Sequence, residues 1–353
     1  MHSASNDNSS FIEYADIFNI SEVIYYRLIA LWVLCEALLG SIIFTFRIPV
    51  SGLVIGSCAI SCISLIAWYY PVKGAIIKAT IIVAIFKMML TPQALPTAYI
   101  AVFFQGLMGE LLFWNRKNYK LACITFALLA LLESALQRIL ILTIVYGNDI
   151  WTVFNKFVQK LMGAASITNY SYLFIISYLL LHVVTALFVG ITMGRLPQKL
   201  SSMYNLLEKY SIAPAEISNT TLSQIKRKRR GKMVLLFILV ILLLMYIQTF
   251  FKIGEPILPQ NQLLRIIIRS IIIILSWYFF ISPVLKKWLR KWLMNKKQQS
   301  ARQVQQVVNL LPTMQNMIAK SWTYSSEKKY FKRLFLFFQI LLVNTFNTSG
   351  SSV

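Results

Sequence analysis

The sequence predicts an all-α, polytopic integral membrane protein with about eight transmembrane helices and further amphipathic helices on the cytoplasmic side. Two features of the composition predict this class: 58% of the 353 residues are hydrophobic and only 13% are charged, whereas soluble domains carry about 25% charged residues. A third feature is the placement of Lys and Arg, which mostly flank apolar segments. A soluble globular fold, a disordered chain and a coiled coil are thereby excluded. Nucleic acid is not needed to explain the net charge of +23.

The apolar segments fall into two groups, each segment being judged against the roughly 20 residues that cross a bilayer. Six segments with short connections make up a predicted six-span membrane domain at 26–195. A later pair makes up a predicted two-span hairpin at 233–285. In order, the segments are 26–46, 50–70, 74–90, 96–114, 121–146, 172–193, 233–251 and 263–285.

The remaining chain is polar or basic. Residues 1–25 contain no Lys or Arg and no early apolar stretch, so this segment is not expected to be a signal peptide. Residues 196–232 are predicted to form a basic cytoplasmic linker. Residues 286–353 are predicted to form basic amphipathic helices, which Pro312 interrupts, and a short apolar tail at 334–346. The tail is interfacial, re-entrant or a tilted half-helix.

The basic residues predict the orientation. Most of them follow the second, fourth, sixth and eighth segments, so these fall on one side of the membrane, and that side is cytoplasmic. The basic residues of the opposite connections are Arg47, Lys156, Lys160 and Lys252. We therefore expect a multi-pass protein of the inner (cytoplasmic) membrane with its N-terminus in the cytoplasm. The residues expected on the cytoplasmic side are Lys73, Arg116, Lys117, Lys120, Arg195, Lys199, the run 226–230, and the Lys and Arg residues of 286–297.

Polar side chains inside the first six segments are the candidate functional residues, because a charge at the bilayer centre costs about 2.5–3.5 kcal/mol. Lys87 either snorkels to the outer surface or faces the protein interior, and Glu110 is expected to pair with Arg116 or Lys117. Glu133 and Arg138 are about 140° apart around one helix. Each is expected to find a partner on another helix, in a structural network or in a ligand site. The full set is Glu36, Lys87, Gln105, Glu110, Glu133, Gln137, Arg138 and His182.

Small residues mark helix-packing faces. Gly52 and Gly56 lie on one face of the second segment, and Gly106 and Gly109 flank polar residues in the fourth; this spacing lets helices approach closely. The four cysteines lie in apolar runs and there are only two histidines. No metal site and no cofactor are therefore predicted. Catalytic motifs are absent, so an enzyme is not expected.

Apolar residues recur at helical spacing after the eighth segment. They form a stripe that either lies on anionic lipid headgroups or docks a cytoplasmic partner. The stripe consists of Leu289, Trp292, Leu293, Val304, Val307, Val308 and Leu311, and it continues after Pro312 with Met314, Met317, Ile318 and Trp322.

Four stretches carry a resemblance to a known family. They are GLVIG at 52–56, PVKGAIIKA at 71–79, PTAYIA at 96–101 with QG at 105–106 and GELL at 109–112, and GITMGRLP at 190–197. Through them, the region 48–197 resembles the substrate-binding membrane subunits of energy-coupling-factor (ECF) vitamin transporters. The resemblance implies six spans, both ends in the cytoplasm, and capture of a small vitamin-like or metal-related nutrient near the outer face.

The same resemblance implies site residues and partners. Side chains at the outer ends of the spans would form the mouth of the substrate site, and Gln105, Glu133 and Arg138 would shape its interior. Residues 233–346 are faintly similar to the coupling membrane subunit of these transporters, which grips cytoplasmic ATPase subunits, although its Ala-Arg-Gly signature is missing. The mouth residues are Arg47, Lys87, Thr91, Gln93 and Tyr99; the coupling residues are Leu311, Met314, Ile318 and Trp322.

Two functions from different classes follow. The first is a membrane subunit for nutrient uptake, with membrane lipid, a small-molecule substrate, ATPase subunits and a coupling subunit as partners and no nucleic acid. The alternative is a non-transport membrane scaffold or assembly factor that recruits partners through its basic cytoplasmic helices.

Overall fold

A computed structural model describes residues 21–40, 51–91, 94, 96–115, 118–162, 169–207, 210, 212 and 260–347. Within these ranges the chain is all-helical and contains no strand. Several predictions lie outside the described residues: the N-terminal segment up to residue 20, the basic run 226–230, the span at 233–251, and the side chains of Arg47, Gln93, Arg116 and Lys117.

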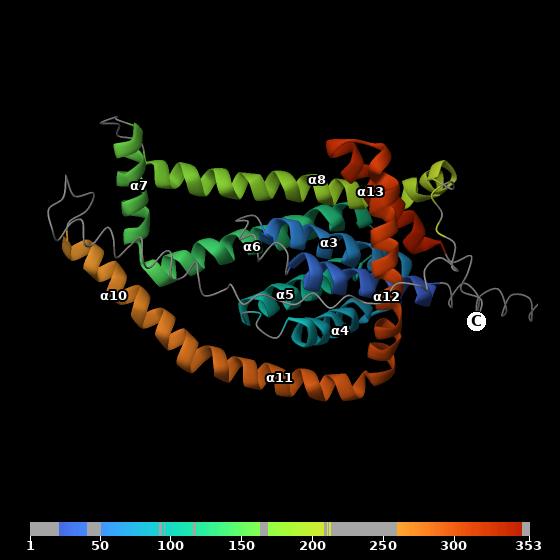
Figure 1. The fold of residues 1–353 in the computed structure, drawn as a ribbon, viewed down its shortest axis with the longest axis horizontal. Helices are drawn as coiled ribbons and strands as arrows, with labels where there is room; N and C mark the ends of the chain where they lie inside the picture. The colour runs from blue at the N-terminus through green and yellow to red at the C-terminus, as the bar shows by residue number, and fades with distance from the viewer. Residues whose placement is uncertain are drawn as a thin grey trace, which may run out of the picture.

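The core of the molecule is a bundle of helices that are apolar on every side (Figure 1). Helices with no polar face are stable only when they are surrounded by other apolar groups. Most of the fully buried large side chains come from these helices, including Trp32, Ile60 and Ile85. The core helices are the helix at 21–34, which continues into a π-helical turn η1 (Cys35–Leu39), α3 (Ser51–Tyr69), α4 (Ala75–Leu90) and α5 (Pro96–Leu112).

Two longer helices, α6 (Tyr119–Tyr146) and α8 (Tyr170–Leu207), run side by side along one wall of the bundle (Figure 1). Their outward side chains are large and apolar, and many are more than one third exposed, such as Leu140, Phe188 and Ile191. A wall of this kind suits hydrocarbon rather than water. Among the residues that the structure describes, four helices are long and apolar enough to cross a membrane: Gly52–Tyr69, Tyr119–Tyr146, Tyr170–Leu200 and Leu264–Gln299.

The helices alternate in direction, so the basic connections gather at one end of the bundle. Tyr25 stacks on Tyr70 with ring centroids 4.4 Å apart, and its hydroxyl donates to the Ala75 carbonyl at 2.9 Å. Tyr119, at the start of α6, donates to the Ser64 carbonyl at 2.9 Å. We call this the basic end. The opposite end, where α4 ends and α5 begins, is called the distal end.

Between the segments predicted at 121–146 and 172–193 the structure contains a further helix, α7 (Asp149–Met162). It joins the ends of α6 and α8 that lie away from α12 and α13 (Figure 1). The Trp151 indole N–H donates to the Thr143 hydroxyl at 3.1 Å, and the Tyr170 amide donates to the Asn155 side chain at 2.8 Å. The apolar residues of α7 recur at helical spacing, and this periodicity is the feature of the sequence from which the helix could have been predicted.

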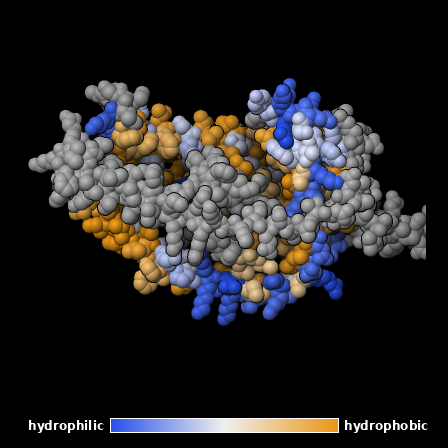
Figure 2. All heavy atoms as spheres, in the orientation of Figure 1, coloured by the Kyte–Doolittle hydropathy of each residue, from blue (hydrophilic) through white to orange (hydrophobic). Residues whose placement is uncertain are grey.

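A single curved helix follows residue 260 and does not end at 285 as predicted. It comprises α10 (Gln260–Ser276), a π-helical turn η5 (Trp277–Ile281) and α11 (Ser282–Gln299). Helix α11 packs beside α4 and α5. The reason is its apolar stripe: Trp292 meets Phe103 with centroids 5.8 Å apart, and Leu293 is fully buried. Figure 2 shows hydrophobic atoms over α10 at the lower left and hydrophilic atoms along the lower edge, where α11 lies.

Two C-terminal helices lie across the basic end: α12 (Ala301–Tyr324), followed by a short turn η6 (Ser325–Glu327), and α13 (Tyr330–Phe346) (Figure 1). The apolar tail at 334–346 belongs to α13. Its end is fixed by Phe346, whose ring lies 4.4 Å from that of Tyr69, and by the Arg27 guanidinium, which donates to the Asn347 carbonyl at 2.7 Å.

Pro312 was expected to interrupt a helix but lies inside α12. Helix α8 also contains a proline, Pro197, and runs on to Leu207, into the region predicted as linker. A proline removes one helical hydrogen bond. In α12, buried Val307 and Met314 on either side of Pro312 hold both halves against the core, so packing outweighs that loss.

The apolar stripe of α12 packs within the chain rather than on lipid or a partner. Met314 is fully buried, and Leu311 and Ile318 are partly buried against the core. Of the four predicted coupling residues, only Trp322 is substantially exposed, at 44%. The structure therefore uses this stripe to attach α12 to the bundle.

Candidate functional site

The distal part of the bundle contains a buried ion pair between Glu36 and Lys87. The Lys87 ammonium lies 2.7 Å from Glu36 Oε2, and the two side chains are only 10% and 5% exposed. Lys87 therefore does not snorkel to the surface. It also donates to the Ala98 carbonyl at 3.1 Å and lies 5.9 Å from the centre of the Tyr99 ring. The pair joins η1 to α4, through two residues that are 51 positions apart in the sequence.

Local structure holds both members of the pair. Glu36 lies in η1, a π-helical turn, and such turns are frequent at functional sites because the extra residue redirects side chains. Lys87 lies in the last turn of α4, where the helix dipole favours a positive charge. The Thr91 hydroxyl and amide both donate to the Lys87 carbonyl, at 2.6 and 2.8 Å, and so close the end of α4.

The structure brings together three of the residues predicted for the mouth of a substrate site. Lys87, Thr91 and Tyr99 all lie where α4 ends and α5 begins, and all three are buried. Glu36 completes the group. Glu36 was predicted to be a charged residue inside a membrane segment, but it was not among the predicted substrate-binding residues.

The remaining interior candidates are spread along the bundle. Gln105 is buried on α5 against Gly56, and its Oε1 accepts no hydrogen bond from the described residues. Glu133 Oε2 is likewise buried without a hydrogen bond from that part of the chain. Arg138 points outward on α6 and interacts electrostatically with Tyr178 of α8. Gln137, next to it, donates to the Thr97 carbonyl at 3.1 Å.

The four glycines predicted to mark packing faces all meet neighbouring helices of the same chain. Gly52 faces Ser134, and Gly106 faces Thr80. A Cβ atom on Gly56 would lie 2.9 Å from Leu131 Cδ2, and one on Gly109 would lie 2.6 Å from Ile63 Cγ2. These faces therefore hold α3, α4, α5 and α6 together.

At the basic end, a second carboxylate has a different environment. Glu110 accepts hydrogen bonds from the backbone amides of Gly74 and Ile76, at 2.6 and 3.2 Å. A small cavity of about 30 Å³ beside it is lined by residues that include Lys73 and Trp114. Burial raises the pKa of the nearby Tyr25 hydroxyl, so this group remains a protonated hydrogen-bond donor.

The distal Glu36–Lys87 pair is the arrangement best suited to binding a charged solute. A buried ammonium can bind an anionic group, and a buried carboxylate can bind a cation or a proton, but each is now neutralised by the other. An incoming charged solute that replaced one partner would release the other. No group of three or more His, Cys, Asp or Glu residues suited to a metal ion occurs in the ranges described.

Comparison of the chain with protein-family models, with curated proteins and with solved structures finds no match.

Proposed function

We propose that this protein is the solute-binding membrane subunit of an uptake system, and that the distal Glu36–Lys87 pair is part of its solute site. The observation that carries the proposal is the burial of two opposite charges between separate helices near one end of an apolar bundle. Charged residues within membrane helices usually mark a substrate or ion pathway. The resemblance of 48–197 to ECF substrate-binding subunits supports a small vitamin-like or metal-related nutrient as the solute.

The proposal includes an eight-span topology in the inner membrane, with the basic end and the N-terminus in the cytoplasm. It is supported by the gathering of Lys73, Lys120 and Arg195 at one end and by the apolar wall of α6 and α8. In this orientation the distal pair lies toward the outside. Residues of the six-span domain bind the solute, and the side of the C-terminal helices that stays exposed, which includes Trp322, connects it to ATPase and coupling subunits.

Ligand binding tests the role of the pair. The full-length protein in detergent is heated with each member of a panel of water-soluble vitamins and divalent transition-metal ions. We expect one probe to raise the melting temperature, since a ligand at about 100 times its Kd adds about 2.7 kcal/mol. The double variant Glu36→Leu/Lys87→Leu is expected to fold, because an apolar pair can replace a buried ion pair, and to lose the response.

The matched control is Glu327→Gln, which changes one carboxylate at the basic end. Glu327 accepts a hydrogen bond from the Tyr210 hydroxyl at 2.6 Å, and glutamine retains an acceptor. Full ligand response in this control and none in the double variant would support the site. A double variant that responds like the unmodified protein would show that the pair is only structural.

Cysteine labelling tests the topology. Phe188→Cys on the apolar wall is expected to resist a water-soluble maleimide in intact membranes, whereas Lys73→Cys, exposed at the basic end, is expected to react from the cytoplasmic side. The native cysteines are buried or half-buried and supply the background. Reaction of Lys73→Cys from the outer side of the membrane would contradict the orientation.

A scaffold role is the second candidate, and the exposed basic surface of α11 favours it. Lys287, Arg290 and Lys291 point away from the bundle beside exposed Trp288. A surface of this kind attracts acidic partners or anionic membranes. Affinity purification that recovers an assembly complex and no ATPase would favour this function over uptake.

A further inference from the structure

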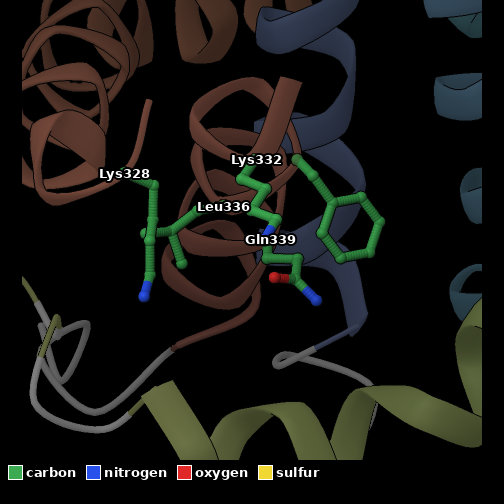
Figure 3. A pocket seen from close by; sticks show the side chains of 5 residues that line it. Lys328, Lys332, Leu336 and Gln339 are labelled. Carbon is green, nitrogen blue, oxygen red and sulfur yellow. The ribbon is translucent and has the colours of Figure 1, made fainter. Parts of the chain in front are cut away.

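The segment just before α13 and α13 itself line a groove that has a basic part and an apolar part. Its volume is about 360 Å³, and it is lined by Lys328, Lys332, Phe335, Leu336 and Gln339 (Figure 3). Lys328 lies in the extended segment before α13, whereas Lys332, Phe335, Leu336 and Gln339 follow one face of the helix at i, i+3, i+4 and i+7. The lysines come first and the apolar residues follow.

The described lining residues of the groove include two lysines and no acidic residue, so their net charge is positive. The neighbouring carboxylate of Glu327 already accepts the Tyr210 hydroxyl hydrogen at 2.6 Å. Lys328 and Lys332 are both exposed. Ammonium groups from Lys328, just before α13, and from Lys332, in its first turn, suit a phosphate, which offers several acceptor oxygens.

The second part of the groove is apolar and remains open to the surroundings. Phe335 is 62% exposed, and Leu334 and Phe338 on adjacent positions are also exposed. Exposed aromatic and aliphatic side chains of this size are unfavourable in water. A ligand with an acyl chain would cover them, whereas an inorganic anion would not.

The position of α13 agrees with a ligand from the membrane. The helix lies across the basic end and packs against α8, whose outward wall is apolar. Figure 2 shows hydrophilic atoms at the upper right, where α12 turns into α13, beside the hydrophobic atoms of α8. A groove at this boundary lies where lipid headgroups meet the acyl chains.

We propose that this groove binds an anionic phospholipid of the adjacent leaflet. The phosphate lies between the ammonium groups of Lys328 and Lys332. The Gln339 amide donates to an ester carbonyl, and an acyl chain covers Phe335 and Leu336. An acidic peptide would satisfy the lysines but leave the apolar part exposed, so the lining favours the lipid. This proposal is independent of the solute site at the distal end.

Native mass spectrometry of the full-length protein tests it. The protein in detergent is titrated with dioleoyl phosphatidylglycerol and, in parallel, with dioleoyl phosphatidylcholine. We expect one phosphatidylglycerol to bind before any phosphatidylcholine does. In Lys328→Gln/Lys332→Gln its affinity is expected to fall roughly thirtyfold, because each basic residue contributes a factor of about five.

The matched control removes the same charge from α11, in Lys286→Gln/Lys287→Gln, and is expected to keep the affinity for the first lipid. Phe335→Ser is expected to weaken the long-chain lipid specifically. Melting temperatures should stay constant, because the substituted side chains are on the surface. Equal losses in both double variants would overturn the proposal in favour of diffuse attraction. Displacement of the lipid by free glycerophosphate, or tighter binding of a polyglutamate peptide to the same lysines, would also overturn it.

Discussion

Two carboxylates at opposite ends of the bundle are both buried or half-buried among apolar helices, but they have different partners. Glu110, at the basic end, accepts two backbone amides at the start of α4. Glu36, at the distal end, accepts the Lys87 ammonium. The first arrangement satisfies amides that the helix leaves free, so the fold itself explains it. The second contributes no helix cap and could be replaced by apolar side chains, which is why we assign a function to that end.

The largest expected change in stability comes from replacing only one member of the Glu36–Lys87 pair. Lys87→Met leaves the Glu36 carboxylate buried without its partner and is expected to lower the free energy of unfolding by about 3–5 kcal/mol. Unfolding in mixed detergent, followed by circular dichroism, measures the change. Glu36→Leu/Lys87→Met should recover most of the loss. A single variant as stable as the double variant would show that the two charges do not depend on each other.

Close helix packing gives the next largest effect and does not depend on either carboxylate. A Cβ on Gly190 would lie 2.7 Å from Ile124 Cα, a backbone atom of α6. Gly190→Ala should therefore push α6 and α8 apart and lower stability by about 1–3 kcal/mol. Gly40→Ala is the control, since its Cβ would meet only the end of the Ile55 side chain at 3.7 Å. The same unfolding assay compares them, and equal melting curves would contradict the tight α6–α8 contact.

The carboxylate at the basic end should matter less than the distal pair. Glu110→Gln removes the negative charge from the start of α4 but leaves one acceptor oxygen. We expect a loss of about 1 kcal/mol in the same assay. A loss as large as that of Lys87→Met would remove the difference between the two ends.

The smallest effect is expected at Lys73, whose ammonium lies 4.8 Å from the centre of the Trp114 ring. Both side chains are exposed. Lys73→Met should therefore lower stability by only about 0.5 kcal/mol. Lys78→Met, an exposed lysine on α4, is the matched control. A difference between them of several times this size would indicate that the basic end is less accessible to water than we describe.

Much of the helical arrangement was predictable from local patterns. The segments expected at 50–70, 74–90 and 121–146 coincide with α3, α4 and α6 within a few residues, because runs of apolar residues bounded by Pro, Gly and charges delimit buried helices. The glycines of the packing faces were also identifiable. The helix α7 was missed because its apolar residues are interspersed with polar ones, although their spacing is helical.

The partners of the polar residues were not predictable. Glu36 and Lys87 are 51 positions apart, and their contact depends on how two helices are rotated about their axes. Arg27 and Asn347 meet across almost the whole chain for the same kind of reason. The burial of Met314 and the continuation of α12 through Pro312 follow from contacts with the bundle, which no local pattern contains.

The sequence by itself determined that this chain is helical, strongly apolar and basic, since composition and periodicity act within each segment and need no knowledge of its neighbours. Tertiary structure alone decided which charges neutralise each other, which glycines admit a neighbouring backbone, and which apolar stripe is left for lipid. Those outcomes depend on the relative rotation and depth of helices, because side-chain interactions decay over a few ångströms while the residues involved are tens or hundreds of positions apart.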